Sequence, residues 1–391
     1  MAQTSTEEIS PAEALRAAAR NCERFISGHG WVRPREALEL LAEATGPEER
    51  SDSYGEGEII ESFEREVANA LGTEAAVFAP SGTMVQQIAL RIWCDRRART
   101  TVAFHPMCHL ETHEQKGYQA LHGLRSTLVG EPHRLITLDD LLGVAEPMGA
   151  LLLELPQRDI GGQLPAWADL VCQVEWAHEH GAAAHMDGAR LWEATPHYER
   201  SYAEVAALFD SVYVSFYKGM GALAGAALAG PEDFIAEARV WIRRHGGNLI
   251  RLFPYVVSAR TAMRDRLDRF PRYYRRARSL GAALASVPGV RVKPDPPQSN
   301  MMHVYLEGDA DRLRQVAVEI ARERGVLLFG WLEQAELPGY ATFELNIGDA
   351  ADSIGDEEVG ELFTELMSRA AQATGVKTAE SSVSSGIPGN E

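Results

Sequence analysis

The strongest constraint on the fold is a regular alternation of short apolar runs with longer helical periods between Ser51 and Gly230. The apolar runs are AAVFA, TVAF, ALLLE, AAAHMD, SVYVSF and ALAGAALAG, and segments such as SGTMVQQIALRIW and PAWADLVCQVEWAHEHG separate them. Apolar strands joined by crossover helices are typical of a parallel sheet that is covered on both faces. We therefore predict an α/β large domain with a mainly parallel sheet.

The rest of the chain divides around this core. The predicted parts are an N-terminal helical arm (1–50), the large domain (51–255), a connecting helix (256–288), a small C-terminal α+β domain (289–375) and a disordered tail (376–391). The connecting helix is interrupted near Pro271, because proline disrupts a helix interior. The tail has too little apolar material to offset its ordering entropy.

Charge and composition exclude several classes of partner. The net charge of -18 repels nucleic acid and anionic membrane surfaces, so we expect neither as a partner. The N-terminus lacks a signal-peptide pattern and no apolar run is long enough to span a membrane, so we expect a cytoplasmic protein. The four scattered cysteines match neither a zinc module nor a disulfide scaffold, which favours reduced thiols.

Lys218 follows the apolar run SVYVSF and precedes the glycine-rich segment GMGALAG. At this place a lysine leaves a buried element and reaches toward a cleft, where desolvation lowers its pKa. An amine with a lowered pKa can form a Schiff base with an aldehyde at neutral pH. The alternative is a surface lysine whose stem lies along the strand end.

Asp187, in AAAHMDGAR, stands at the carboxyl end of another predicted strand, where open α/β sheets bind their ligands. A buried carboxylate there can keep a pyridine nitrogen protonated, as pyridoxal 5'-phosphate (PLP) requires to withdraw electrons from a carbanion. A turn-forming Asp-Gly pair is the ordinary alternative. Arg190 is a candidate for a bidentate contact with a carboxylate or for a cofactor contact near the ring oxygen, and a surface ion pair is the alternative.

Ser81, Gly82 and Thr83 follow AAVFAP and open a predicted helix. Their hydroxyls and free N–H groups lie at the positive end of the helix dipole, which predicts a phosphate site. Simple N-capping by Ser81 needs no ligand and is the alternative. Ser215, which precedes Lys218 by three residues, is a further candidate hydroxyl for the same phosphate.

The segment FHPMCHLETHEQKG gathers several titratable residues, namely His105, Cys108, His109, His113 and Glu114. His109 and His113 are spaced to share one face of a helix. The spacing matches no standard zinc pattern, so we predict no metal. We expect His109 to lie on an aromatic cofactor ring, with His113 or Glu114 assisting proton transfer.

Over residues 51–260 these segments resemble the L-threonine aldolase and β-eliminating lyase family of fold-type I (aspartate aminotransferase-like) PLP enzymes. The resemblance is carried by SGT at 81–83, by HMDGAR at 185–190 and by the lysine of KGMGALAG, which follows Asp187 by 31 residues. Glu154 and the glycine pair of ELPQRDIGGQLP match a further family element.

The resemblance implies PLP as the cofactor and assigns roles to the motif residues. Lys218 would form the Schiff base, Asp187 would pair with the pyridinium nitrogen, and residues 81–83 would bind the phosphate. His109 would stack on the ring. An amino acid is the implied substrate, which the arginine of the HMDGAR motif, Arg190, would contact.

Two further segments resemble parts with which family enzymes complete the active site across a subunit interface. Tyr54, in DSYGEGEIIESFE, looks like part of the loop supplied by the partner. Arg251, in RRHGGNLIRLF, is a candidate for the phosphate, although it is shifted by one residue from the family's GG-x-x-R pattern. The resemblance therefore implies a homodimer or homotetramer.

One departure from the family concerns the substrate carboxylate. Family aldolases bind it with an arginine late in the small domain, whereas the counterpart segment TFELNIGD has Phe343 or Glu344 at that place. Losing a bidentate contact weakens substrate binding unless another arginine replaces it. Arg158, in LPQRDIGG, is our candidate replacement.

These observations predict a PLP-dependent carbon–carbon lyase of the threonine aldolase type, which cleaves or forms a β-hydroxy-α-amino acid from glycine and an aldehyde. The altered carboxylate site is compatible with a specialised substrate. The alternative is a β-eliminating lyase that releases pyruvate and ammonia. A noncatalytic protein is disfavoured by the retained Lys218 and Asp187, and a metal hydrolase would require a metal at the His-rich segment.

Overall fold

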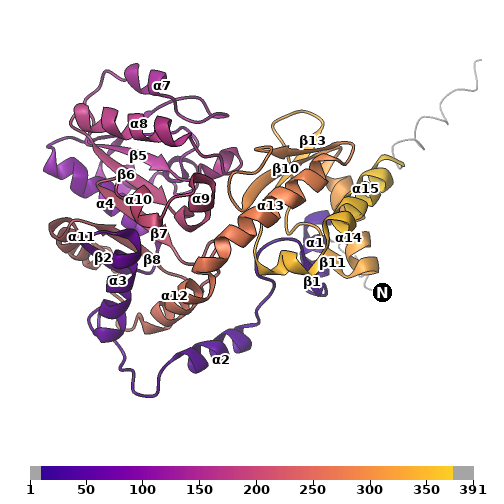
Figure 1. The fold of residues 1–391 in the computed structure, drawn as a ribbon, viewed down its shortest axis with the longest axis horizontal. Coiled ribbons are helices and arrows are strands. Elements are labelled where there is room, and N and C mark those ends of the chain that lie inside the picture. The colour runs from indigo at the N-terminus through magenta and orange to yellow at the C-terminus, as the bar shows by residue number, and fades with distance from the viewer. Residues whose placement is uncertain (1–9, 373–391) are drawn as a thin grey trace, which may run out of the picture.

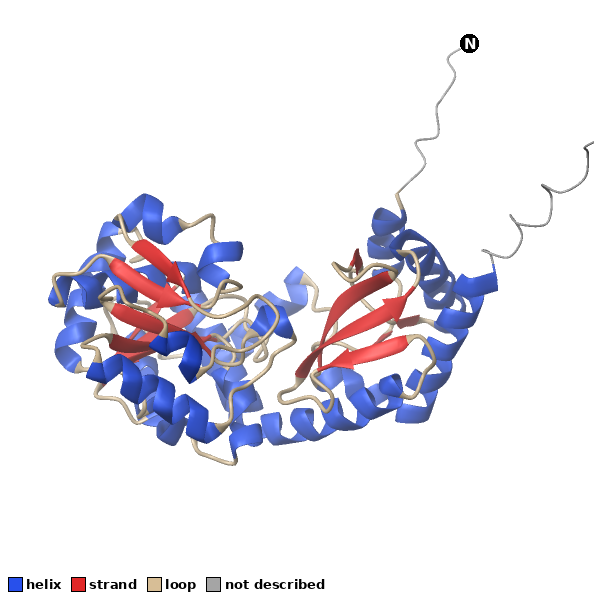
Figure 2. Cartoon of the chain, turned by 90° about the horizontal axis from the view of Figure 1, so that it is seen from above, coloured by secondary structure: helices blue, strands red, loops and turns tan. Residues whose placement is uncertain are grey.

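The computed structural model describes residues 10–372. The two larger sheets lie side by side, each with its own covering helices, and two long helices run between them (Figures 1 and 2). The predicted disordered tail, 376–391, lies outside the described residues.

The larger sheet has seven strands in the order β2-β8-β7-β6-β5-β3-β4. They are β2 (Ala75–Ala79), β3 (Thr101–Phe104), β4 (Arg125–Leu128), β5 (Ala150–Glu154), β6 (Ala183–Gly188), β7 (Ser211–Ser215) and β8 (Ala226–Gly230). Strands β3 to β7 pair in parallel, while β8 is antiparallel to both of its neighbours. The prediction of a mainly parallel sheet is confirmed.

Helices cover both faces of this sheet. They are α3 (Glu58–Leu71), α4 (Gly82–Arg96), α5 (His109–Thr112), α6 (Gly117–His122), α7 (Leu138–Leu142), α8 (Trp167–Glu179), α9 (Leu191–Tyr198), α10 (Tyr202–Ala206) and α11 (Glu232–Arg244). Alternate strand residues enter two different hydrophobic cores: Leu151 and Leu153 pack with α3 and α8, whereas Ala150 and Leu152 pack with α4 and α11. Burial on both sides explains why the strands are continuous apolar runs.

The connection between the two sheets is helical. It consists of α12 (Phe253–Arg266), a short 3-10 turn η2 (Leu267–Arg269) and α13 (Phe270–Ala285). Pro271 lies in the first turn of α13, where its missing N–H removes no helical hydrogen bond.

The smaller sheet is antiparallel, in the order β12-β13-β10-β9. Its strands are β9 (Val290–Lys293), β10 (Met301–Glu307), β12 (Glu333–Gln334) and β13 (Tyr340–Asn346), and α14 (Ala310–Arg324) and α15 (Asp356–Gln372) accompany it. Along β13 burial alternates, so that Ala341, Phe343 and Leu345 enter the core. Thr342 and Glu344 therefore face the opposite side of the sheet, which is polar.

The N-terminal segment returns to the small domain. Helix α1 (Pro11–Ala19) packs against α14, and β1 (Arg24–Phe25) pairs in parallel with β11 (Val326–Leu327). Within residues 10–50, the described part of the predicted arm, helix α2 (Pro34–Ala44) extends away from the body and buries no residue (Figure 1). Within residues 10–372 no helix has the length and apolar character needed to cross a membrane.

Candidate active site

Lys218 lies just after β7, half-buried at the carboxyl end of the large sheet. Burial lowers the pKa of its amine, and the nearby guanidinium groups of Arg190 and Arg158 lower it further. Within residues 10–372 the amine forms no ion pair with a carboxylate. This environment favours the reactive, cleft-facing interpretation of Lys218 over the surface alternative.

Asp187 is buried at the end of β6 and lies close enough to both Lys218 and His109 to interact with them electrostatically. Its neighbour across the strands is Glu154, which is also buried. Burial raises the pKa of both carboxyls, and a negative charge nearby adds to the rise: that of Asp187 for Glu154, and that of Glu114 for Asp187. A cation at this place would stabilise the charged form of the pair. The Asp-Gly turn is present as well, since Ala189 donates its N–H to Asp187 at 3.0 Å.

Ser81 precedes α4 but forms no capping hydrogen bond through its side chain. Within the described chain the hydroxyls of Ser81 and Thr83 have no hydrogen-bond partner, so the capping alternative does not account for them. Gly82 has its own steric reason, because a Cβ there would lie 2.0 Å from the Tyr213 hydroxyl. The turn thus presents free hydroxyls at the start of a long helix, which is the chemistry of a phosphate site.

Ser215 is less available. Its hydroxyl donates to the carbonyl of Ala189 at 3.1 Å, so its hydrogen is already used. The structure gives no support to Ser215 as a phosphate donor.

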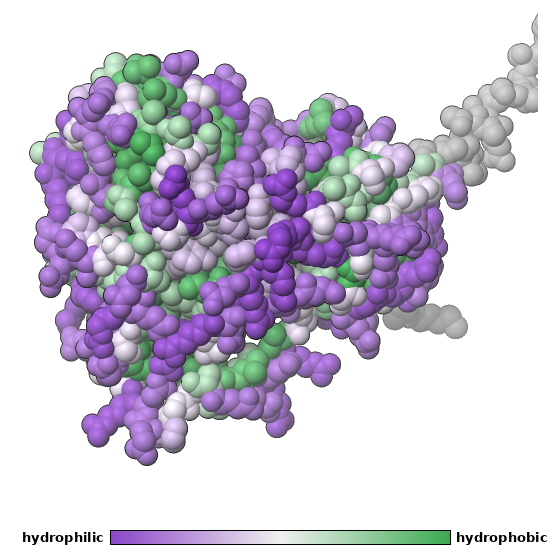
Figure 3. Space-filling view, in the orientation of Figure 1, coloured by the Kyte–Doolittle hydropathy of each residue, from purple (hydrophilic) through white to green (hydrophobic). Residues whose placement is uncertain are grey.

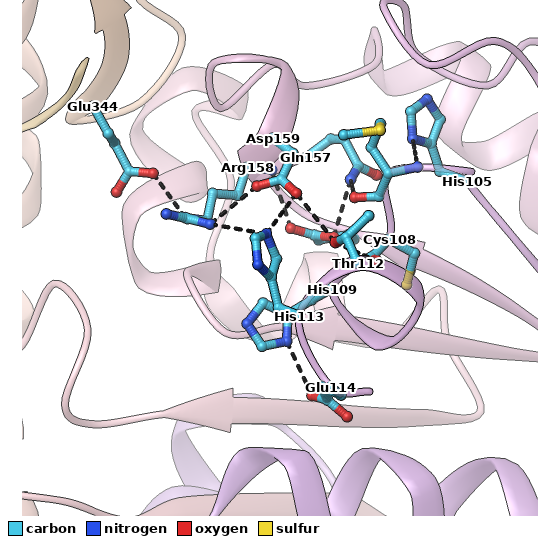
Figure 4. A network of polar contacts seen from close by, with 12 residues as sticks. His105, Cys108, His109, Thr112, His113, Glu114, Gln157, Arg158, Asp159 and Glu344 are labelled. Atoms are coloured by element: carbon cyan, nitrogen blue, oxygen red, sulfur yellow. Dashed lines mark hydrogen bonds and ion pairs between the residues drawn. The ribbon is translucent and has the colours of Figure 1, made fainter. Parts of the chain in front are cut away.

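The His-rich segment separates into two parts (Figure 4). His105 points away and contacts the backbone carbonyls of Glu131 and Arg134 at 3.0 and 2.8 Å. Cys108 is fully buried, which raises the pKa of its thiol. Among residues 10–372 no group of three or more His, Cys, Asp or Glu side chains is placed to hold a metal ion.

His109 and His113 are neighbours with ring centroids 5.1 Å apart. The Nδ1 of His109 lies 3.0 Å from Glu114, whose side chain is buried and also accepts from Gln87 at 3.3 Å. A proton on Nδ1 directed at a carboxylate leaves Nε2 of His109 as the basic nitrogen. The Nε2 of His113 lies 2.8 Å from Asp159.

Arg158 and Arg190 converge on one carboxylate, that of Glu344 (Figure 4 shows the Arg158 side). The distances are 2.7 Å from Nε of Arg158 and 3.4 Å from Nη2 of Arg190. Of the two residues considered for the missing arginine, Phe343 lies in the core and Glu344 faces the site. The negative charge of Glu344 acts to raise the pKa of Lys218, so the group formed by Arg158, Arg190 and Glu344 lies close to the amine.

Glu193 was not predicted from the sequence. Its buried carboxyl contacts Gly219, the residue that follows Lys218. Burial raises the pKa of Glu193 to about 7, and the N–H of Gly219 donates to its carboxyl. A Cβ on Gly219 would lie 2.1 Å from Oε1 of Glu193. The available signal was one acid within the otherwise apolar LWEA segment of α9.

Tyr54 and Arg251 lie outside this cluster. Their loops pair through a 3.3 Å hydrogen bond from the Tyr54 N–H to the Ile250 carbonyl. Both side chains are exposed, and the Arg251 guanidinium donates to the carbonyl of Ile250. Within one chain they do not contact the candidate site.

The sequence matches the family described as β-eliminating lyase over residues 39–307. The chain belongs to this family. Low-specificity L-threonine aldolase 1 of Arabidopsis thaliana is 27% identical over 308 residues, covering 76% of this chain and 85% of the plant protein. The aldolase vrtJ of Penicillium aethiopicum is 31% identical, covering 71% of this chain and 72% of the fungal protein.

Among solved structures there are relatives of higher sequence identity. A putative L-allo-threonine aldolase from Listeria monocytogenes is 43% identical, with a TM-score of 0.87, covering 92% of this chain and 100% of the other. Sphingomonas wittichii serine palmitoyltransferase, at 18% identity and a TM-score of 0.64 over 90% of this chain and 88% of the other, shares the fold alone. The fold-type I prediction is confirmed, and the protein is a PLP-dependent lyase of the threonine aldolase type.

The residues present fit this cofactor. The free hydroxyls of the turn at 81–83 suit a phosphate, and the amine of Lys218 has a lowered pKa. A cation beside the buried acid pair of Glu154 and Asp187 would stabilise its charged form. A PLP molecule offers all three complementary groups: an anionic phosphate, an aldehyde and a protonated ring nitrogen.

Proposed function

We propose that this lyase cleaves and forms the Cα–Cβ bond of β-hydroxy-α-amino acids, with glycine and an aldehyde as the other pair of reactants. The observation that supports it best is the convergence of Lys218, Asp187 and His109 at the carboxyl end of the large sheet. When bound, PLP supplies an electron sink for the carbanion that this cleavage leaves at Cα.

Residues at three places would hold the cofactor in this proposal. Lys218 would attach it covalently, Asp187 would pair with its ring nitrogen beside Glu154, and residues 81–83 would bind its phosphate. His109 would stack on the ring. The Nδ1 contact of His109 with Glu114 at 3.0 Å fixes the imidazole orientation.

Arg190 and Arg158 bind the substrate α-carboxylate in this proposal. Their guanidinium groups already share the carboxylate of Glu344, which demonstrates that one carboxylate can contact both. Replacing Arg158 with alanine is expected to raise KM for the amino acid with a smaller effect on kcat. An unchanged Michaelis constant would remove Arg158 from this role.

Proton transfer at the substrate β-hydroxyl requires a base near the ring. The Nε2 of His109 is available for this, since Nδ1 is occupied by Glu114. His113 lies next to it but is engaged by Asp159 at 2.8 Å, which makes His109 the better candidate base and His113 its supporting neighbour.

The proposed attachment site is tested by borohydride reduction followed by peptide mapping. We expect a cofactor adduct on Lys218 and none after Lys218→Ala, with Lys116→Ala as the matched control. An adduct on another residue would refute this assignment.

The reaction is tested by supplying L-threonine, L-allo-threonine and β-thio amino acids to the loaded enzyme. Glycine and an aldehyde are the products expected from this proposal. A 2-oxo acid and ammonia as the main products, with 2-oxobutanoate from threonine or pyruvate from cysteine, would instead indicate β-elimination, which the family description also names.

We further infer a homodimer or homotetramer in which Tyr54 and Arg251 complete the active site of the partner. Apolar side chains are exposed around α2, including Trp31 at 65% and Leu38 at 64%, and Figure 3 shows hydrophobic surface near this segment. Exposed apolar groups of this size favour burial against another chain. Light scattering gives the mass in solution, and loss of activity in Tyr54→Phe without loss of assembly tests the loop.

We also infer a cytoplasmic location. All four cysteines are unpaired, which suits a reducing compartment. Cell fractionation tests this directly.

A further inference from the structure

A cavity of about 990 Å³ opens between the two domains beside the Arg158–Glu344 pair. On the large-domain side it is lined by Met107, His113 and residues 158–160. On the other side it is lined by the polar face of the small sheet. The methyl group of threonine would fill little of this space, since drug-sized ligands occupy pockets of roughly 300–1,000 Å³.

The polar sheet face forms two rows that run across the strands. In the first row Glu344 of β13 lies opposite His303 of β10, which lies opposite Lys293 of β9. Directly opposite residues of an antiparallel sheet point to the same side. The first row therefore leads from the candidate catalytic site to Lys293 over two strand spacings, about 10 Å.

The second row is Thr342, Tyr305 and Arg291. The Thr342 hydroxyl is buried and has no hydrogen-bond partner among the described residues. Arg291 donates to the hydroxyl of Tyr340, lies over its ring and is close enough to Glu307 to interact electrostatically, but it forms no ion pair in residues 10–372. This row gives the cavity wall further polar groups beside the first row.

Lys293 is a cation of the cavity wall with a single hydrogen-bond partner in residues 10–372. Its amine is half-buried and contacts only the carbonyl of His133, at 3.3 Å. Within the described residues it has no carboxylate partner, although the chain as a whole carries a net charge of -18. His303 lies between Lys293 and Glu344 and forms no hydrogen bond or ion pair with any residue in the range 10–372.

The acidic side chains that line the cavity do not pair with Lys293 on β9. Glu344 is shared by two arginines, and Asp159 contacts His113 and Arg158. Glu333 belongs to β12, at the opposite edge of the sheet from β9, and Glu336, which is 88% exposed, lies 3.9 Å from the imidazole of His133. Within the described residues none of these acids forms an ion pair with Lys293, which leaves an unpaired cation at the β9 edge of the cavity.

We propose that this cavity is a subsite for the distal part of an extended amino acid substrate, and that Lys293, with Arg291, binds an acidic group at the end of its side chain. The inference rests on the proposed function, because it takes Lys218 and the arginine pair as the place of the α-amino and α-carboxylate groups. A carboxylate and a phosphate share the required chemistry, an oxyanion that accepts charge-assisted hydrogen bonds.

Calorimetric binding to the loaded enzyme tests the subsite. The probes are three amino acids of equal length, namely 2-aminooctanedioate, 2-amino-7-phosphonoheptanoate and the uncharged 2-amino-8-methylnonanoate. At least one acidic probe is expected to bind about tenfold more tightly than the uncharged one, and the stronger acidic probe identifies the oxyanion. Lys293→Met is expected to remove this preference without changing the affinity for the uncharged probe, whereas the control Arg243→Gln, on α11, changes neither.

Two results would overturn the subsite: equal affinity for all three probes, or a preference that persists in Lys293→Met combined with Arg291→Gln. The proposed function is measured separately, by threonine formation from glycine and acetaldehyde. Failure of that reaction with a retained, Lys293-dependent preference would refute the proposed function and leave the subsite supported.

Discussion

The Nε2 of His29 lies 2.8 Å from the carbonyl oxygen of Gly219, the residue that follows the candidate catalytic lysine. A carbonyl only accepts, so Nε2 carries the hydrogen. Nδ1 lies 3.3 Å from the backbone N–H of Asp349 and 3.1 Å from the carboxylate of the same residue. Burial and the charge of Arg266 lower the pKa of His29, and its contacts with Gly219 and Asp349 oppose this shift. Arg266 extends the contact by donating to the carbonyl of Met220 at 2.9 Å. The N-terminal segment and the connecting helix α12 thus both contact this loop.

His29 should therefore act as a positioning residue for Lys218. In His29→Ala we expect kcat to fall about tenfold to a hundredfold, because small displacements of a reacting group are costly. His29→Gln should recover most of the loss, since its amide can also donate to Gly219. The pH titration of the visible absorbance of the loaded enzyme should shift in the alanine variant. An unshifted titration with unchanged kcat would exclude this role.

Gly219→Ala should displace the same loop from the other side. A Cβ there would lie 2.1 Å from the carboxyl of Glu193, so either this buried side chain or the peptide after Lys218 has to move. We expect much reduced borohydride labelling of Lys218 and a lower melting temperature. Gly360→Ala in α15 is the control, because nothing lies within 4 Å of its Cβ position and alanine favours helix. Equal labelling in both variants would contradict the expectation.

Much of the fold could be predicted because its signals are local. Runs such as ALLLE and AAAHMD become the parallel strands β5 and β6, since burial on both faces requires apolar residues at every position. The docking of α1 on α14 and the pairing of β1 with β11 could not be predicted in this way. They join segments about three hundred residues apart, and no pattern in either segment indicates which other segment it contacts.

The same distinction holds for the candidate site. Lys218 and Asp187 were recognisable because Lys218 follows one apolar strand and Asp187 lies at the end of another, in a sheet whose carboxyl edge binds ligands. The choice between Phe343 and Glu344 needed the register of β13, and the contacts of Glu193 and His29 needed the folded loop around Gly219. Their roles depend on neighbours brought together by tertiary structure.

Glu344→Gln should strengthen binding of the substrate carboxylate. Glu344 holds Arg158 and Arg190 at 2.7 and 3.4 Å, so its charge competes with a substrate carboxylate for the same guanidinium groups. Glutamine keeps the shape and removes the charge. We expect KM for glycine in the aldol-forming direction to fall about threefold to tenfold, the scale of one charge-assisted contact. A raised KM would indicate that Glu344 orients the arginines and does not compete with the substrate.

Glu193 should make the stability of the cofactor-free protein fall as pH rises. Its carboxyl has an ordinary pKa of 4.5 in the unfolded chain and about 7 in the folded protein, because burial disfavours the charged form. Between these values the folded state binds more protons than the unfolded state, so the free energy of unfolding decreases with pH, by about 3 kcal/mol in total for this shift. Below pH 4.5 the group has no effect, and above about pH 7 the loss is complete.

Glu193→Gln cannot titrate, so its stability advantage over the original protein should grow from pH 5 to pH 7.5. Urea unfolding of the cofactor-free proteins at several pH values measures this difference directly. Glu175→Gln is the matched control, since Glu175 is exposed on α8 and the same substitution there removes no buried charge. A difference between Glu193→Gln and the original protein that stays constant with pH would show that the buried carboxyl does not titrate in this range.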